Sequence, residues 1–161
     1  MTNSFEKRLG SGHRVEAGRS SHYAELLDPE HTLPSVILEV VGEDSIEGET
    51  FHSFEITNDE GMKVGDINLV VHDETNQAEI DLIELDGEFT KKGYGRASYL
   101  ALIEQLTRTG VHLRSGNSLS REAKSIWDWM VERGAAKKVA EGNTDETVGR
   151  FGYSTAAYEV I

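Results

Sequence analysis

The sequence predicts a single α+β domain built on a mixed, mostly antiparallel sheet. Its 161 residues are 37% hydrophobic and 28% charged, which suits one domain with a buried core. After residue 33, several β-type segments follow one another with short connections, as in an antiparallel meander. From about residue 94 the apolar period changes from strand-like to helical, so helices alternate with short strands in the second half.

Turn residues bound each predicted strand of the first half. LPSVILEVVG, residues 33–42, is rich in β-branched residues and is expected to end at Gly42, before an acidic turn, EDSIEGE. TFHSFEIT alternates between two faces and predicts a half-buried strand that ends in the turn at 58–61. GDINLVVH puts Ile67, Leu69 and Val71 on one face, and AEIDLIEL is the next strand.

Two helices are expected in the second half. Residues 94–109 predict one with its apolar residues broadly on one side, ended by Gly110 and followed by the short strand VHLRS. About residues 119–133 predict another, N-capped by Ser118 or Ser120 and ended by Gly134. AAKKVAEG and GYSTAAYEVI are two closing strands. The second helix carries an apolar stripe of Ala123, Ile126, Trp127, Met130 and Val131, with Trp129 off the stripe, where it would line a cleft or an interface.

Residues 1–32 differ in composition from the rest of the chain. They are polar and glycine-containing, so we expect a poorly ordered or atypical segment with one short helix around 22–27, followed by the domain at 33–161. Its three histidines stand nine residues apart and share no face, so no metal site is expected. The sequence has no membrane-length apolar run and no secretory leader, which predicts a cytoplasmic protein.

Charge and cysteine content exclude several functions. The chain has no cysteine, which rules out disulfides, thiolate metal sites and cysteine nucleophiles. The net charge is −13, and residues 1–80 hold 17 acidic and 5 basic residues, a net of −12. An acidic half attracts cations and disfavours nucleic acid, although excess acid also serves solubility alone.

The stretch at 79–96 carries the clearest functional signal. An apolar strand ends near Leu85, and after a short loop Gly93 and Gly95 open a helix. Free main-chain amides and the helix dipole make such an end an anion site, which we interpret as a diphosphate cradle. No Walker loop is present, and Ser98 stands at the third glycine position of a dinucleotide-binding turn. The alternative is a glycine turn that only redirects the chain. The cations beside it are Lys91, Lys92 and Arg96.

This segment resembles the acetyl-CoA motif R/Q-x-x-G-x-G/A of the GNAT superfamily of N-acetyltransferases. Gly93 and Gly95 match the two small positions, whereas Thr90 stands at the R/Q position. The segment from Ser120 to Gly134 resembles the family's N-x-x-A-x-x-x-Y helix, with Ser120 in place of Asn and Trp127 in place of Tyr. The resemblance covers about residues 35–161.

The resemblance implies the GNAT fold, with helices packed on both faces of the sheet and an acetyl-CoA site between two splayed strands, at 78–85 and 111–115. It implies acetyl-CoA as co-substrate, no metal, and a homodimer, since dimers are frequent in the family. Amides near 83 and 85 would hold the pantetheine and the carbonyl oxygen, and those of 91–96 the pyrophosphate. The implied CoA-binding residues are Ile83, Leu85, Thr90, Lys91, Lys92, Gly93, Tyr94, Gly95, Arg96 and Ser120.

Acetyl transfer to an amine needs a base, because an amine with a pKa of about 10.4 is mostly cationic at neutral pH. Glu79 stands where some GNAT enzymes carry a glutamate base, and Asp81 projects to the same side. Glu84, expected on the opposite side and nearer the carbonyl, is the second candidate. For each of these three carboxylates, a solvated side chain without a catalytic role is about as good an explanation. His112 has a suitable ordinary pKa, but a lone strand histidine is more often structural.

The general acid is open, because an indole cannot give a proton to a thiolate as the usual tyrosine can. Ser120, Tyr153, Tyr158 or solvent would serve instead. The sequence therefore predicts an N-acetyltransferase that works by direct attack of a cationic amine, from a small molecule or a protein. One alternative is a CoA-binding module with little or no transferase activity. Another is an acidic interaction protein that binds no CoA.

Overall fold

The computed structural model describes residues 14–16, 22–116, 118–141, 144–145, 153–154 and 156–161. In chain order, its elements are β1 (Arg14–Glu16), α2 (His22–Leu27), β2 (Val36–Ile46), β3 (Glu49–Asn58), β4 (Lys63–His72), β5 (Gln77–Leu85), the 3-10 turn η1 (Gly87–Phe89), α3 (Tyr94–Arg108), β6 (His112–Arg114), β7 (Leu119–Ser120), α4 (Arg121–Glu132), β8 (Ala136–Ala140), β9 (Thr144–Asp145), β10 (Tyr153–Ser154) and β11 (Ala157–Val160).

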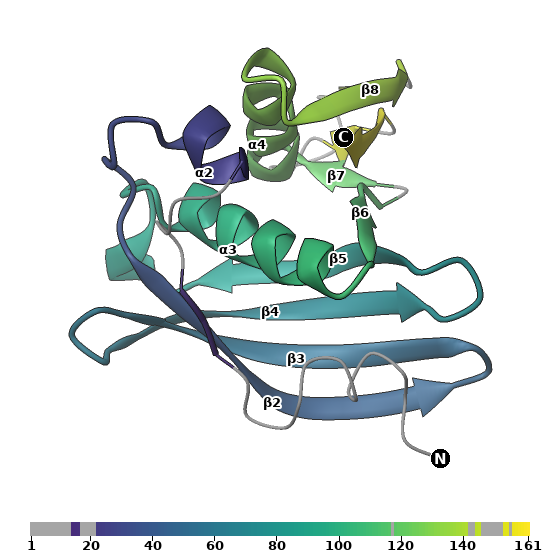
Figure 1. Ribbon diagram of the computed structural model, residues 1–161, viewed down its shortest axis with the longest axis horizontal. Helices are drawn as coiled ribbons and strands as arrows, with labels where there is room; N and C mark the ends of the chain where they lie inside the picture. Colours follow the sequence, from purple (N-terminus) through teal and green to yellow (C-terminus); the bar gives the residue numbers. More distant parts are fainter. Residues whose placement is uncertain (1–13, 17–21, 117, 142–143, 146–152, 155) are drawn as a thin grey trace.

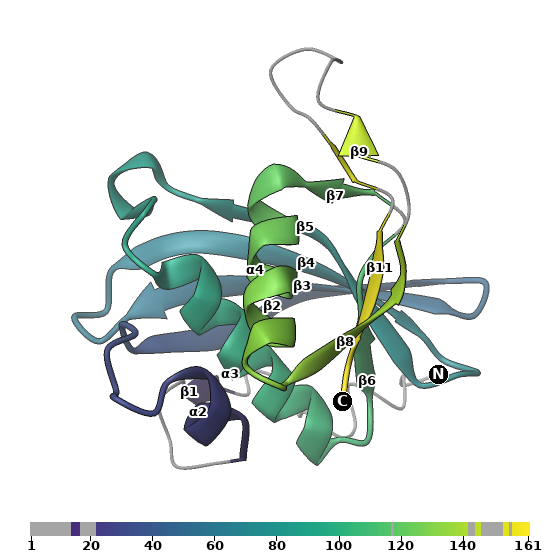
Figure 2. The same cartoon turned by 90° about the horizontal axis from the view of Figure 1, so that it is seen from above.

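The main sheet is mixed and mostly antiparallel, which confirms the predicted fold class. In the described part of the chain it has eight strands, in the order β1-β2-β3-β4-β5-β6-β11-β8 (Figure 1). Of its pairs, β5 and β6 alone run parallel, joined by the crossover helix α3. A second, short sheet has the order β7-β10-β9, and Figure 2 shows it at one end of α4.

The meander β2–β5 forms as the alternation predicts, with Ile67, Leu69 and Val71 buried on its inner face. The predicted end of β2 at Gly42 is wrong, since the strand continues through the expected acidic turn to Ile46. Gly42 follows a bulge, and the chain reverses at Glu47 and Gly48, whose φ angles of 46° and 83° are those of a two-residue hairpin turn.

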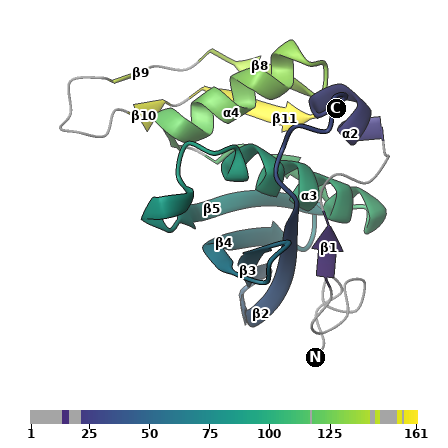
Figure 3. The same ribbon diagram turned by 90° about the vertical axis from the view of Figure 1, so that its left-hand side faces the viewer.

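Helix α3 is the centre of the core. Figure 3 shows it between strands β2–β5 and a layer formed by α4, β8 and β11. Residues 97–106 of α3 are therefore all buried, whereas the sequence predicted apolar residues on one side. The outer face of β2–β5 carries no helix in the described residues, so in this half the helices cover one face of the sheet rather than the predicted two.

Helix α4 confirms the predicted caps. The Ser120 hydroxyl oxygen accepts a hydrogen bond from the Ala123 amide at 3.1 Å, and Gly134 follows the helix with a φ of 80°. Trp127 and Met130 are buried as the stripe predicts. Trp129 does not line a cleft as expected, because it is 6% exposed and covered by the Arg96 guanidinium, 4.8 Å from the ring centre.

The amino-terminal segment is described only in part. The short helix expected at 22–27 is α2, and the Tyr23 hydroxyl donates to the Ile161 carbonyl at 2.8 Å. Residues 1–13 and 17–21 lie outside the described residues, so the expectation of poor order at 1–32 stays a prediction for them. Among the helices described, none is both long and apolar enough to span a membrane.

Candidate functional site

Strands β5 and β6 separate and leave a wedge in the sheet. They pair only where residues 77–79 face residues 112–114. Beyond this point β5 continues to Leu85, whereas the segment that follows β6 turns toward β11. There the Ser115 amide donates to the Tyr158 carbonyl at 2.8 Å. The edge of β5 from residue 80 onward therefore has no strand beside it in the described residues, and its main-chain groups are open to a ligand.

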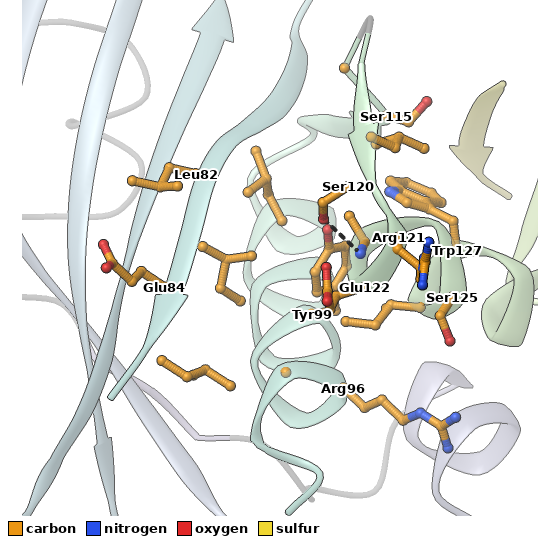
Figure 4. Close-up of a pocket in the computed structure, with 18 of the residues that line it drawn as sticks. Leu82, Glu84, Arg96, Tyr99, Ser115, Ser120, Arg121, Glu122, Ser125 and Trp127 are labelled. Carbon is orange, nitrogen blue, oxygen red and sulfur yellow. Dashed lines mark hydrogen bonds between the residues drawn. The ribbon is translucent and has the colours of Figure 1, made fainter. Parts of the chain in front are cut away.

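A β-bulge in β5 changes which side chains face the wedge. Ile80 pairs with Leu69 and Leu82 with Asn68, so Asp81 has no partner across the ladder. The alternation of side chains between the two faces of β5 therefore shifts by one residue at Asp81. Leu82 and Glu84 then point away from Tyr99, toward the outer side of the sheet (Figure 4). The expectation that Glu84 and Glu79 project to opposite sides is therefore wrong, because the bulge places both on the outer face.

A groove of about 1270 Å³ occupies the wedge. One wall is β5 from Ile80 to Leu85, and the other is the chain from Arg114 to the start of α4. Figure 4 shows Tyr99 rising from α3 between these walls. The volume exceeds the roughly 300–1,000 Å³ of ordinary drug-sized pockets, so the groove suits a long ligand.

One end of the groove is built as an anion site. Gly93 caps α3 with a φ of 88°, and the first amide bonded within the helix is that of Ala97, which donates to the Gly93 carbonyl at 3.0 Å. The amides of residues 94–96 come before this first helical bond and therefore have no acceptor within the helix, and no side chain caps them. Lys91, with a φ of 60°, and Arg96 also line the groove. Unpaired donors, the helix dipole and Lys91 thus meet at one place, whereas the charged end of Arg96 lies over Trp129.

The two glycines of the motif have different structural roles. Gly93 needs the left-handed conformation that other residues rarely adopt. Gly95 leaves room for α4, because a Cβ there would lie 3.3 Å from the Ile126 side chain. The sequence predicted close ligand approach for both glycines. Both glycines line the groove, and at Gly95 the structure shows close helix packing as well, which brings α4 against the anion site.

Two predicted CoA-binding side chains lie outside the groove lining, and the hydroxyl of a third is already bonded within the protein. Lys92 and Tyr94 are absent from its lining, and the Tyr94 ring packs edge-on against Phe89 at 5.5 Å. Thr90 lines the groove, but its hydroxyl donates to the Gly87 carbonyl at 2.9 Å. That hydroxyl is used inside the loop, so the expected hydrogen bond from it to a phosphate is not available in this conformation.

The other predicted site residues are brought together. Ile83, Leu85, Gly93, Gly95 and Ser120 all line the groove, on β5, α3 and the start of α4. The Ser120 hydroxyl oxygen serves as the α4 cap and remains able to donate its proton.

Two of the candidate bases, Glu84 and Asp81, line the groove on β5. The third, Glu79, does not, because its carboxylate lies 2.7 Å from the Arg114 guanidinium and 3.5 Å from His72 Nε2. His112 also lies away from the groove, at a small cavity beneath α3. Asp81 and Glu84 are therefore the candidate bases that line the groove.

Of the candidate acids, Tyr158 is buried with its hydroxyl donating to Asp128 at 2.5 Å, and Tyr153 is described only by its strand position. Sequence reasoning missed Tyr99, which lines the groove and is 2% exposed. Its position four residues after Gly95, on the same helix face, was the available signal.

Comparison with known proteins supports the fold. No protein-family model and no curated protein matches the chain. Among solved structures, spermidine N-acetyltransferase from Vibrio cholerae in complex with CoA and spermine matches with a TM-score of 0.51 and 18% identity, over 71% of this chain and 66% of that chain. A chimera of the Vibrio cholerae enzyme SpeG with hSSAT matches with a TM-score of 0.50 and 19% identity, over 69% and 66%.

The matched region thus spans just under two thirds of each of these two acetyltransferases. At such identities the likeness concerns the arrangement of the chain in space. With the meander, the bulged β5, the crossover α3 and the splayed parallel pair, it shows that this chain has the GNAT fold.

Proposed function

We propose that this chain is an acetyl-CoA-dependent N-acetyltransferase. The observation that carries the proposal is the set of unpaired amides at residues 94–96, which meet Lys91 at one end of a long groove. A pyrophosphate fits such an end, because main-chain donors and a nearby cation bind its charges together. The solved structure that this fold matches was obtained with CoA and spermine bound to that protein.

The free edge of β5 would hold the rest of the cofactor. An extended pantetheine arm can pair with main-chain groups of residues 80–85 as an added strand would. The bulge at Asp81 turns main-chain groups out of the ladder at mid-strand. A main-chain amide there can donate to the thioester oxygen as negative charge develops on it, which lowers the barrier to amine attack.

The acceptor amine would approach from the outer side of β5. Glu84 points to that side from the groove wall, so we assign it as the base that receives the amine proton, directly or through water. Asp81, at the bulge, is the alternative. Turnover of Glu84→Gln and Asp81→Asn separates them, since the true base loses about 10²–10⁴-fold in kcat and the other carboxylate does not.

Calorimetry with acetyl-CoA, followed by an amine screen that reads thiol release, tests this function. The transferase binds acetyl-CoA and releases thiol with at least one amine. A CoA-binding module, the second candidate that Trp127 at the usual tyrosine position favours, binds without release. An acidic interaction protein shows no binding, and this result would end the proposal. The homodimer and the cytoplasmic location stay predictions.

Four carboxylates stand opposite one another across the outer face of the sheet. The register pairs Glu39 with Glu55, Glu55 with Asp66, and Asp66 with Glu84. Opposed like charges destabilise a sheet, and they create a strongly negative strip. Lys63 lies 3.2 Å from Asp66. A hydrogen bond with Asp66 and the charges of Asp66 and Glu55 raise the pKa of Lys63.

This acidic row leads to the groove. It starts opposite Arg14 of β1 at one edge and ends at Glu84 on the groove wall. The row lies on the side from which we expect the acceptor, and this placement supports a cationic amine as substrate. A polyamine fits this strip because its several charges can follow the carboxylates from strand to strand.

We expect a variant with both Glu55→Gln and Asp66→Asn to acetylate spermine about threefold more slowly at low salt, with little difference near 1 M salt, where charges are screened. The control carries Glu25→Gln and Glu132→Gln, which remove two charges away from the row. Rates are compared for spermine and for the amino group of glutamate. Equal use of both amines by the wild-type chain would contradict a cationic preference.

A further inference from the structure

Tyr99 lies where the leaving group of the proposed reaction would form. Helix α3 runs back along β5, because β6 begins beside Gln77. Figure 4 shows the Tyr99 ring across the groove from the part of β5 that carries Leu82 and Glu84, with Arg96 nearer the start of α3. The side chain is 2% exposed and lines the groove. Tyr99 is thus beside the open edge of β5.

An aromatic stack holds Tyr99 in place. Its ring meets Trp127 edge-on at 6.1 Å and 88°, and Trp127 stacks on Tyr158 at 5.8 Å and 20°. The Tyr158 hydroxyl donates to Asp128, which also pairs with Lys124 at 2.6 Å. The Tyr158 hydroxyl is therefore bonded to a carboxylate on α4, whereas Tyr99 lines the groove.

Trp127 lies against the Tyr99 side chain, edge-on to its ring. Burial raises the pKa of Tyr99 above its ordinary range, and the neighbouring Trp127 side chain offsets part of that rise. The indole N–H can only donate, so Trp127 does not compete for the proton of the Tyr99 hydroxyl. A raised pKa also means that Tyr99 stays a neutral phenol throughout turnover.

We propose that the Tyr99 hydroxyl donates a hydrogen bond to the thioester sulfur as it leaves, and that Trp127 is the residue that positions it. The inference rests on the proposed function. The amine nitrogen bonds to the carbonyl carbon, the C–S bond breaks, and its electron pair goes to sulfur. The amine's surplus proton leaves through the base, the thiolate takes a proton from water, and Tyr99 keeps its own.

In the family resembled, a tyrosine at the position of Trp127 assists the leaving thiolate. Here that role is divided between two residues. α3 supplies the phenol, and α4 supplies an indole that cannot transfer a proton but can orient the phenol. Stabilisation of a thiolate by a neutral donor is enough, since a thiol of pKa about 8.5 is a good leaving group.

Tyr99→Phe tests the proposal, with Tyr158→Phe as the matched control, because both changes remove one hydroxyl from the same stack. We expect Tyr99→Phe to lower kcat by about 10- to 100-fold, the range of a hydrogen bond to a charged group, with little change in KM. Tyr158→Phe should keep kcat within about twofold, whatever it does to the melting temperature. Equal kcat in Tyr99→Phe and wild type, or equal losses in both variants, would overturn the proposal.

A second measurement needs no acceptor amine. The ultraviolet absorbance of the thiolate reports the pKa of the CoA thiol in the complex, and Tyr99→Phe should raise that pKa by about one unit relative to wild type. Trp127→Phe should raise it too, while Tyr158→Phe should not. An unchanged thiol pKa in Tyr99→Phe would refute the role of Tyr99, whereas wild-type protein that binds no CoA would refute the proposed function itself.

Discussion

A Gly93→Val variant is expected to bind CoA at least about tenfold more weakly than the wild-type chain. Gly93 has a φ of 88°, which a β-branched residue can adopt only with strain, and its Cβ would lie 3.2 Å from Pro34. The loop must then change course and redirect the amides of residues 94–96. Loss of one charge-assisted hydrogen bond, about 1.5–3 kcal/mol, accounts for the expected factor. Calorimetry with CoA measures it.

Gly110→Val is the matched control. Gly110 follows the other end of α3 with a φ of 75°, and apart from its two chain neighbours no residue comes within 4 Å of a Cβ built there. Both variants carry backbone strain of about 1–3 kcal/mol, so both should melt earlier. Only the Gly93 variant should lose CoA affinity. If the two variants bind CoA equally well, the amides at the start of α3 are not the anchor.

Gly65→Ala should destabilise the chain by about 1–3 kcal/mol and disturb the groove wall. Gly65 lies on β4 opposite Leu85, and a Cβ there would overlap the Glu84 carbonyl oxygen and come within 3.0 Å of the Leu85 Cα. Both contacts are with main chain, which cannot rotate away. The strands must therefore separate where β5 borders the groove. Chemical denaturation measures the loss, and CoA titration measures the effect on the site.

Gly42→Ala on β2 is the comparison for that variant. A Cβ at Gly42 would make ordinary contact with the Ser53 Cβ at 3.6 Å, so the change should stay within about 0.5 kcal/mol. If the Gly65 variant is as stable as the Gly42 variant and binds CoA normally, the close approach of β4 and β5 has no part in shaping the groove.

The repeating parts of the fold could be predicted from the sequence, because they depend on local patterns. Alternation defines β3 and β4, and the caps of α4 are visible as Ser120 and Gly134. The course of β2 past Gly42 could not be predicted, since a glycine at a bulge and a glycine at a strand end look alike. The full burial of α3 depends on the second layer, which no local pattern shows.

The candidate site divides in the same way. The helix start at Gly93 follows from glycine spacing and nearby cations. The pairing of Glu79 with Arg114 depends on which residue faces it across β5 and β6, so the sequence left Glu79 as a free base. The bulge at Asp81 moved Glu84 to the outer face, and Tyr99 was hidden among the apolar residues of α3.

The central claim is that the unpaired amides at the start of α3 bind the pyrophosphate of CoA. Calorimetric titration with CoA and with pantetheine, which has the same thiol arm but no pyrophosphate, tests it most directly. The structure predicts that CoA binds at least about 100-fold more tightly, the equivalent of one or two charge-assisted hydrogen bonds, with an affinity that falls as salt rises. Equal affinity for both ligands, or heat from neither, would contradict it.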